Sequence, residues 1–372
     1  MKLFIGLMSG TSMDGIDAAL VDLETNSLVY GVTCPYSKEA KEALLKALAQ
    51  KAHSAGFYSQ LNTLLGREFA KTVLHLLGKS KFLPADIIAI GSHGQTLCHD
   101  TTASIPFTVQ LGCAHTIAEM TGIKVVADFR TRDLVTGGQG APFAPIFHQA
   151  IFNGQGFPLA ILNVGGIANL TYLANEKDVR GYDLGPGNCL LDAWIFAELE
   201  KEYDHDGEWA STGVVIDPLL QALLLDPYFE RKAPKSIGKE YFSLDWLKYY
   251  LNDNYSPRDI QATLLQLTAI TIAMGINELP LCPEYLLVCG GGAHNKALLR
   301  ALSQLLPEVC VCSTEKFNIN PDFVEAHMFA WLAEKTVNNI ALDLNPITGA
   351  RHPAILGAIY PAGIDKIISN AV

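Results

Sequence analysis

The sequence predicts an α/β protein in which one strand–turn–strand unit occurs twice. The first copy is a buried strand at Leu3–Met8, a polar glycine-rich turn and a second strand at Ile16–Leu23. The second copy is a strand at Leu159–Asn163, a small-residue turn and a strand at Ala168–Leu173. The copies lie about 155 residues apart, which indicates that one α/β unit is duplicated.

Length and composition agree with two globular domains. The chain has 372 residues, more than one ordinary core needs, and its 49% hydrophobic and 17% charged residues are normal for a globular protein. We place an N-terminal domain at 1–140, to which the segment 350–372 returns, and a C-terminal domain at 141–350. No linker or low-complexity tract separates them, so the domains should pack closely around a cleft.

Between and after the two copies, hydrophobic periodicity predicts the remaining elements. The last helix is expected to begin at Pro321, with Asn320 as its cap. Short strands are predicted at Ile87–Ile90, Ile123–Ala127 and Tyr285–Cys289, and helices at Lys38–Leu77, Leu190–Tyr203, Pro218–Leu225, Asp259–Asn277, Lys296–Leu306 and Pro321–Asn338.

Charge, cysteines and hydropathy exclude several classes of protein. The net charge of −11, from 27 basic and 38 acidic side chains, shows no basic excess of the kind that nucleic-acid binders carry. The eight cysteines form no CxxC pair, which is typical of free thiols in a reducing cytosol. No stretch approaches the roughly 20 apolar residues that cross a bilayer. We expect a soluble cytoplasmic protein without a nucleic-acid or membrane partner.

Three glycine-rich turns that follow predicted strands are candidates for phosphate binding. Gly10–Asp17 has the glycine spacing of a P-loop but carries Ile16 at the obligatory lysine position, so the Walker motif is excluded. Its backbone can still form an anion-binding nest, and an ordinary tight hairpin is the alternative. Gly165–Gly166 follows a second strand, and Gly290–Gly292 lies where a strand gives way to a helix whose N-terminus favours phosphate. Three such turns favour a nucleotide site.

Several carboxylates and amides near these turns fit phosphoryl transfer. Asp14 and Asp17 would repel a bare phosphate, so they indicate Mg²⁺ or contact with a second substrate. Asp183 precedes a rigid Gly/Pro turn and suits the base that a kinase needs, although a turn-stabilising role is the alternative. Asn188 is either a helix cap or a group that orients Mg²⁺-bound water.

A second polar group could hold a sugar. His93 and Gln95 lie past the end of one predicted strand and Arg130 past the end of the next. The planar fork of Arg130 can pair with a carboxylate through two parallel bonds, whereas a lone histidine is more often structural. Glu325 lies on a partly apolar helix face, where it is either a buried partner of a cation or a substrate ligand.

Six motifs lie in a fixed order along the chain: Gly6–Gly15, Ser92–Thr96, Asp128–Arg130, Gly137–Pro142, Asn163–Asn169 and Asp183–Asn188. Together they resemble the motif series of the anhydro-N-acetylmuramic acid kinase family. The resemblance implies an α/β fold of actin-like (ribonuclease H-like) duplicated domains flanking an interdomain ATP cleft. It implies ATP and Mg²⁺ as cofactors and a small-molecule anhydro-sugar as substrate.

The resemblance also implies a role for each motif residue. Asp183 would deprotonate a water that attacks C1 of 1,6-anhydro-N-acetylmuramic acid, and the released O6 would take the γ-phosphoryl group of ATP. Asp14 and Asn188 would serve Mg²⁺. The sugar would be held by His93, Gln95, Arg130 and Glu325. The nucleotide would be bound by Gly10, Thr11, Ser12, Met13, Asp14, Gly15, Ile16, Asp17, Gly165, Gly166, Asn169, Gly290, Gly291, Gly292 and Asn295.

Three alternatives remain at this point. One is a plain hexose or carboxylate kinase that acts on a free hydroxyl group. Another is a non-catalytic, nucleotide-switched module, although the sequence shows no substrate-binding appendage, polymer-forming insertion or long linker. The third is an ATP-independent lytic enzyme for peptidoglycan fragments. For any of the kinases we expect a homodimer.

Overall fold

The computed structural model describes residues 1–10, 13, 15–49, 53–152, 154–238 and 240–363. Contacts between residues divide the chain into two units. The first unit holds Met1–Phe147 and the segment from Phe323 onward, and the second holds His148–Asp322. Each unit is described by itself, and the cleft expected between two domains stays a prediction.

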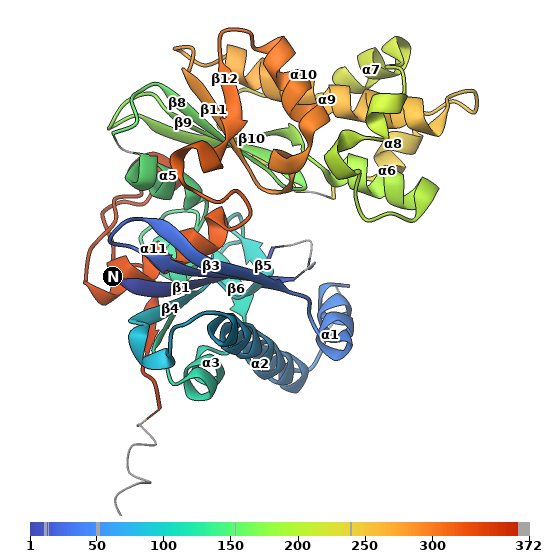
Figure 1. The fold of residues 1–372 in the computed structure, drawn as a ribbon. Coiled ribbons are helices and arrows are strands. Elements are labelled where there is room, and N and C mark those ends of the chain that lie inside the picture. The colour runs from blue at the N-terminus through green and yellow to red at the C-terminus, as the bar shows by residue number, and fades with distance from the viewer. Residues whose placement is uncertain (11–12, 14, 50–52, 153, 239, 364–372) are drawn as a thin grey trace, which may run out of the picture. The chain divides into compact units, whose positions relative to one another are not determined.

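The first unit is built on a six-stranded sheet (Figure 1). Its strands are β1 (Leu3–Met8), β2 (Ile16–Asp22), β3 (Ser27–Cys34), β4 (Ala89–Ser92), β7 (Val125–Ala127) and β13 (Ala358–Tyr360). Their order is β13-β7-β4-β1-β2-β3. The first three strands form an antiparallel meander, β4 runs parallel to β1, β7 runs parallel to β4, and β13 closes the edge antiparallel to β7. A separate two-stranded sheet pairs β5 (Gln95–Asp100) with β6 (Phe107–Leu111).

Alternate residues of β1 pack on opposite faces of this sheet, as the period of a strand requires. Leu3, Ile5 and Leu7 enter a core with the helices α1, α2 and α3. On the other face lies α11. The helices of the first unit are α1 (Lys38–Leu48), α2 (Ala55–Lys79), α3 (Ala114–Thr121), α4 (Phe129–Val135), α11 (Val324–Val337) and α12 (Asn345–Thr348), with a 3-10 helix, η1, at Pro84–Asp86.

Two glycines allow α11 to lie directly against the sheet. Gly6 of β1 and Gly91 of β4 are register partners. A Cβ on Gly6 would lie 1.7 Å from the carbonyl oxygen of Ala326, and one on Gly91 would lie 1.9 Å from that of Phe329. No residue with a side chain fits at either position without moving the helix. This close packing brings Glu325 and Phe329 to the carboxyl end of β4.

The second unit repeats the strand arrangement of the first. Its strands are β8 (Leu159–Val164), β9 (Ile167–Leu173), β10 (Val179–Pro186), β11 (Tyr285–Cys289) and β12 (Cys310–Ser313). Their order is β10-β9-β8-β11-β12, with an antiparallel β8–β9–β10 meander, β11 parallel to β8 and β12 parallel to β11. Strand for strand this matches β3-β2-β1-β4-β7. The predicted duplication and the actin-like α/β fold class are confirmed.

Helices fill the rest of the second unit. Against the sheet, α9 and α10 form one core, while α9 also forms a second, helical core with α6, α7 and α8. The helices are α6 (Cys189–Leu199), α7 (Asp217–Leu224), α8 (Leu244–Lys248), α9 (Pro257–Asn277) and α10 (Lys296–Leu305), with 3-10 helices η2 (His205–Gly207), η3 (Ala210–Thr212), η4 (Gly291–His294) and η5 (Thr314–Phe317). The boundary between the units falls within α5 (Ala144–Phe152).

Helix α9 corrects one expectation from the sequence. It is long and apolar enough to cross a membrane, with a mean hydropathy of 1.3, whereas we expected no such stretch. However, 78% of its most apolar window is buried inside the protein. By burial it is a core helix, because its apolar side chains already pack in both cores of the second unit.

Other differences from the sequence prediction concern element boundaries. The region 38–77 forms two helices, and β3 was not predicted. Helix α11 begins at Val324 after Phe323, so Asn320 does not cap it; the side chain of Asn320 accepts a hydrogen bond from the backbone N–H of Asp322 at 3.0 Å. We included this helix in the C-terminal domain 141–350, but it packs on the sheet of the first unit.

Candidate active site

Asp183 lies inside strand β10, not ahead of a turn as predicted from the sequence. In register it faces Asn169 of β9, and Asn169 in turn faces Asn163 of β8. Directly opposite residues of antiparallel strands project from the same face of a sheet. The three side chains therefore form a polar row across the β8–β9–β10 meander.

Neutral donors hold both oxygens of the Asp183 carboxylate. The amide Nδ2 of Asn169 donates a hydrogen bond to Oδ1, and the backbone N–H of Ile237 donates to Oδ2 at 2.9 Å. The backbone of Asp183 is fixed as well, since its N–H donates to the carbonyl of Lys235 at 2.9 Å and its carbonyl accepts from the Tyr228 hydroxyl at 3.0 Å. The carboxylate therefore has a single defined orientation.

The environment of Asp183 tunes its proton affinity in two opposing ways. Burial raises the pKa of Asp183, because desolvation disfavours the charged form. The hydrogen bonds from Ile237 and Asn169 stabilise the carboxylate and oppose this rise in pKa. A general base is most effective when its pKa lies near the working pH. A carboxylate whose pKa is raised by burial, and whose charged form is stabilised by two donors, suits proton abstraction.

The Gly165–Gly166 turn receives the segment that follows β10. The backbone N–H of Asn188 donates to the carbonyl of Gly165 at 2.8 Å, and that of Gly187 donates to the carbonyl of Gly166 at 2.9 Å. Asn188 stands at the cap position of α6, but its amide nitrogen donates to the carbonyl of Val164 at 3.1 Å and does not cap the helix. Its Oδ1 takes no part in that bond, and the predicted role of Asn188 toward Mg²⁺-bound water stays a prediction.

The predicted nucleotide glycines of the second unit divide into two kinds. Gly290 has φ +74°, and a Cβ there would lie 2.4 Å from Oδ1 of Asn163; a Cβ on Gly292 would lie 2.4 Å from Cβ of Val164. These two glycines serve packing. By contrast, a Cβ on Gly165 would meet nothing closer than 3.9 Å and one on Gly291 nothing closer than 3.5 Å. Gly165 and Gly291 therefore leave their backbone open to a ligand.

Two predicted nucleotide residues have structural hydrogen bonds in this unit. Asn169 donates its amide to Asp183. Asn295 is buried and caps α10, where its Oδ1 accepts from the backbone N–H of Leu298 at 3.0 Å. Both side chains are committed to protein partners through these atoms.

In the first unit the structure brings together Asp17, His93, Arg130 and Glu325. Arg130 donates to Nε2 of His93 from Nε at 3.1 Å and from Nη2 at 2.9 Å. Burial lowers the pKa of Arg130 to about 10, with Glu325 opposing, so the guanidinium stays charged at neutral pH. Within the described part of the chain, no carboxylate lies within 4.0 Å of its nitrogens.

Glu325 lies beside this guanidinium without a short ion pair. Desolvation and the negative charge of Asp17 raise the pKa of Glu325, while Arg130 lowers it. The side chain still reaches solvent, so the two neighbouring charges are the firmer causes. Of the two roles left open by the sequence, an exposed carboxylate without a salt bridge fits a substrate ligand better than a buried partner of a cation.

A network of side-chain hydrogen bonds supports the hairpin after β1. The hydroxyl of Ser9 donates to the carbonyl of Gly15 at 2.8 Å, and Tyr36 donates its own hydroxyl to Ser9 at 2.9 Å and to Oε1 of Gln95 at 3.3 Å. Burial raises the pKa of Tyr36 to about 12, so the hydroxyl stays a donor. Gln95 is only 1% exposed, so its side chain acts in this network.

Other predicted residues of this hairpin contribute backbone only or are not described. Ile16 is buried in the core, and Met13 packs against that core with φ +59°. Thr11, Ser12 and Asp14 lie outside the described residues, so the predicted metal role of Asp14 stays a prediction. Gly10 accepts a backbone hydrogen bond from Met13 at 3.2 Å.

Sequence reasoning missed the segment that holds Asp183 in place. Tyr228, Lys235 and Ile237 contact Asp183 through one hydroxyl and two backbone groups. Backbone contacts carry no side-chain signature, so two of the three could not be found from residue types. The Lys235 ammonium lies over the ring of Tyr228, 4.8 Å from the ring centroid. This cation–π contact links the two ends of the segment.

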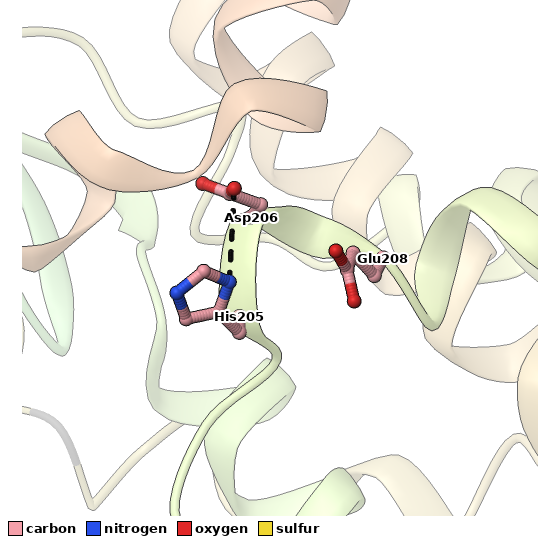
Figure 2. A group of neighbouring side chains, drawn as sticks. All are labelled: His205, Asp206 and Glu208. Atoms are coloured by element: carbon pink, nitrogen blue, oxygen red, sulfur yellow. Dashed lines mark ion pairs between the residues drawn. The ribbon is translucent and has the colours of Figure 1, made fainter.

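One other group of possible metal ligands occurs among the described residues: His205, Asp206 and Glu208, whose ligand atoms all lie within 4.8 Å of one another. Figure 2 shows this group, with the ion pair of 3.6 Å between His205 and Asp206 dashed. The Asp206 carboxylate also binds the ammonium of Lys296 at 2.7 Å. Because a cation already neutralises the central carboxylate, we assign no metal to this group.

A model of the anhydro-N-acetylmuramic acid kinase family matches residues 2–362. This chain belongs to that family. It is 56% identical over 361 residues to an anhydro-N-acetylmuramic acid kinase of Legionella pneumophila (strain Lens), covering 97% of this chain and 99% of the relative. It is 44% identical over 362 residues to one of Pseudomonas syringae pv. syringae (strain B728a), covering 96% and 99%. The family resemblance and the kinase class inferred from the motifs are confirmed.

Among solved structures, the activator of the 2-hydroxyisocaproyl-CoA dehydratase from Clostridium difficile with bound ADPNP is similar, with a TM-score of 0.47 and 12% identity over 92% of this chain and 98% of that one. Because both the TM-score and the sequence identity are low, no functional conclusion is drawn from this likeness.

Proposed function

We propose that this enzyme converts 1,6-anhydro-N-acetylmuramic acid and ATP into N-acetylmuramic acid 6-phosphate and ADP, as a step in the recycling of cell-wall sugars. Family membership supports the substrate class. The observation that carries the reaction is the Asp183 carboxylate, which burial pushes toward a higher pKa and two donors hold in one orientation.

The chemistry of the substrate explains why a base is needed. O6 is tied to C1 in the anhydro bridge, so the sugar offers no free hydroxyl at that position. Asp183 takes a proton from a water that attacks C1, the C1–O6 bond breaks, and O6 takes the γ-phosphoryl group. The products are the 6-phosphate, ADP and the proton that Asp183 later releases to solvent.

The nucleotide lies against the glycine turns in this proposal. Gly165 and Gly291 present open backbone, and the Gly10–Asp17 hairpin supplies further N–H groups. The donor set fits Mg²⁺, since Oδ1 of Asn188 and the carboxylate of Asp14 are hard oxygen ligands. Bound with ATP, Mg²⁺ would neutralise phosphate charge.

The sugar is held in the proposal by Arg130 and Glu325. Arg130 carries a charge without a carboxylate partner among the residues that the structure describes, which fits an acidic substituent such as a lactyl carboxylate. Glu325 offers an exposed acceptor for sugar hydroxyls. We further propose a cytoplasmic homodimer, which sedimentation of the purified protein would test.

An ADP-release assay with purified 1,6-anhydro-N-acetylmuramic acid tests the proposal, combined with mass analysis of the sugar product. We expect ADP release that depends on the anhydro-sugar and a product carrying one added water and one added phosphate group. Turnover with a reducing amino sugar alone would indicate a plain hexose kinase. Opened sugar without ADP would indicate a lytic enzyme.

A further inference from the structure

His93 and Arg130 meet at the carboxyl edge of two neighbouring strands. His93 directly follows β4, Arg130 follows the end of β7 at the start of α4, and β4 and β7 are parallel partners. Two nitrogens of the guanidinium, Nε and Nη2, donate to the same ring atom, Nε2 of His93, at 3.1 and 2.9 Å. The edge of the guanidinium formed by Nε and Nη2, here called the side edge, is therefore occupied by one imidazole.

The imidazole must be neutral to accept these bonds. A nitrogen that accepts from arginine carries no proton, so the proton of the ring resides on Nδ1. Burial and then the charge of Arg130 lower the pKa of His93 to about 3, so the ring stays neutral at physiological pH. Nδ1 is buried, and no group among the described residues stands in good hydrogen-bond geometry to it. The backbone of Gly94 opposes the fall in the pKa of the ring, but by less than burial and Arg130 lower it.

Packing prevents the ring from turning. His93 is 5% exposed and lies against Phe329, with ring centroids 4.8 Å apart. Phe329 in turn lies 5.5 Å from Phe129. Gly91 lets α11 lie directly on β4, so the backbone of Phe329 packs against the sheet beside His93. The acceptor atom of His93 is thus a fixed point in the fold.

An arginine side chain has five N–H donors in a rigid fork. His93 takes one from Nε and one from Nη2, which leaves the end edge formed by Nη1 and the second N–H of Nη2. A carboxylate accepts two parallel bonds from one such edge. With the side edge closed, a bound carboxylate can be held in this bidentate way only at the end edge.

We infer that His93 is a positioning residue that closes the side edge of Arg130 and aims its end edge at a carboxylate on the sugar. It makes the enzyme selective for anhydro-sugars that carry an acidic substituent. This inference rests on the proposed function, in which Arg130 holds the lactyl carboxylate. It changes the role predicted for His93 from a substrate contact to a residue that acts through Arg130.

The test compares two substrates, 1,6-anhydro-N-acetylmuramic acid and 1,6-anhydro-N-acetylglucosamine, which lacks the lactyl group. The readout is the ratio of their kcat/KM values in the wild type, His93→Leu, Arg130→Ala and the double variant. We expect Arg130→Ala to lower the ratio roughly 100-fold and His93→Leu roughly 10-fold, the range of charge-assisted hydrogen bonds. In the Arg130→Ala background, His93→Leu should change the ratio less than about 3-fold.

Two further variants separate positioning from folding. His327→Leu removes another buried imidazole, 2% exposed and packed on Phe147, and should leave the ratio unchanged. His93→Gln keeps an acceptor and should recover most of the ratio lost in His93→Leu. If His93→Leu does not fold, His93→Gln and His93→Met are compared in its place, and equal ratios in those two would overturn the inference.

The remaining outcomes distinguish the role of His93 from the proposed binding of the lactyl carboxylate by Arg130. An equal loss from His93→Leu with and without Arg130 would show that His93 acts independently, and the inference would be wrong. An unchanged ratio in Arg130→Ala would remove the carboxylate-binding role of Arg130 itself, and the role of His93 with it.

Discussion

The two units carry the same sheet but use its end differently. At the end of β1 and β4 in the first unit, three charged groups, Asp17, Arg130 and Glu325, lie near one another. In the second unit, where β8 and β10 end and β9 begins, the carboxylate of Asp183 is held by neutral donors. The first arrangement suits binding of a polar, charged ligand, and the second suits one defined proton transfer.

The two units also differ in the structural role of their glycines. In the first unit, Gly6 and Gly91 make room for a helix, whereas in the second unit Gly165 and Gly291 leave backbone uncovered. The glycines inside the strands of the first unit therefore serve packing, whereas these two glycines in the turns after the strands of the second unit leave room for a ligand. Each of the following predictions tests one side of this contrast.

Asp183→Asn should have the largest effect on activity. The amide preserves size but cannot accept a proton, so kcat should fall roughly 1000-fold, within the range of general-base catalysis. ATP affinity, measured by calorimetry, should stay within about tenfold, or ~1.4 kcal/mol. Turnover close to that of the wild type would remove Asp183 from the role of base.

Gly6→Ala should have the largest effect on stability. The new methyl would lie 1.7 Å from the Ala326 carbonyl oxygen, so α11 must move away from β1. We expect a loss of about 3 kcal/mol or more in the free energy of unfolding, measured by urea denaturation. The matched control is Gly78→Ala in α2, where a Cβ meets nothing within 4 Å; it should be neutral or stabilising by roughly 0.5–1 kcal/mol. Similar losses in both variants would contradict the packing argument.

Gly290→Ala should cost stability through collision as well as backbone strain. Gly290 and Gly154 both have positive φ, +74° and +95°, but only Gly290 has a neighbour, Oδ1 of Asn163, within 2.4 Å of a Cβ. Gly154→Ala should therefore lower the free energy of unfolding only through backbone strain, by roughly 1–2 kcal/mol. Gly290→Ala should lower the free energy of unfolding measurably more, as followed by thermal unfolding. Equal losses of stability in the two variants would show that the side chain of Asn163 moves aside at little cost.

Asn169→Leu should shift the pH dependence of catalysis. Removing the amide donor destabilises the Asp183 carboxylate, so its pKa rises and a higher pH is needed to ionise the base. The acidic limb of the kcat profile should move to higher pH. Asn338→Leu, which removes an amide bound to Glu334, is the control and should not move it. A downward shift would contradict the assigned hydrogen bond.

Buried histidines should make the protein less stable as the pH falls from 7 toward 5. Burial lowers the pKa of His93 and His148 to about 3 and that of His327 to about 4, below the unfolded value of 6.5. The unfolded state therefore binds more protons, and stability present above pH 6.5 is lost on acidification, by at most about 1.4 kcal/mol per histidine per pH unit. Thermal unfolding across this range measures the loss. A flat profile would show that these rings titrate in the folded protein with the same pKa as in the unfolded chain.

Much of the architecture could be predicted from the sequence because it depends on local pattern. The continuous apolar runs of β1 and β8 and the glycine turns after them identify the duplication. The start of α11 could not be predicted, since Asn320 and Pro321 give a strong start signal that tertiary packing overrides.

The site was predictable where side-chain chemistry is distinctive and unpredictable where the backbone acts. Asp183 was singled out as a carboxylate beside a rigid Gly/Pro turn, and Arg130 as a planar cation able to pair with a carboxylate. The contacts of Ile237 and Lys235 with Asp183 come from backbone atoms, and the pairing of His93 with Arg130 depends on strands that are distant in sequence. Neither could follow from residue type and spacing alone.

The most direct test of the account follows the bridging oxygen. 1,6-Anhydro-N-acetylmuramic acid is prepared with heavy oxygen at O6 and converted in ordinary water, and the product is examined by phosphorus NMR and mass spectrometry. The account predicts that the heavy oxygen remains on C6 and forms the bond to phosphorus, with the C1 hydroxyl derived from water. Heavy oxygen at C1, or a phosphate ester without the label, would contradict opening of the bridge by water at C1.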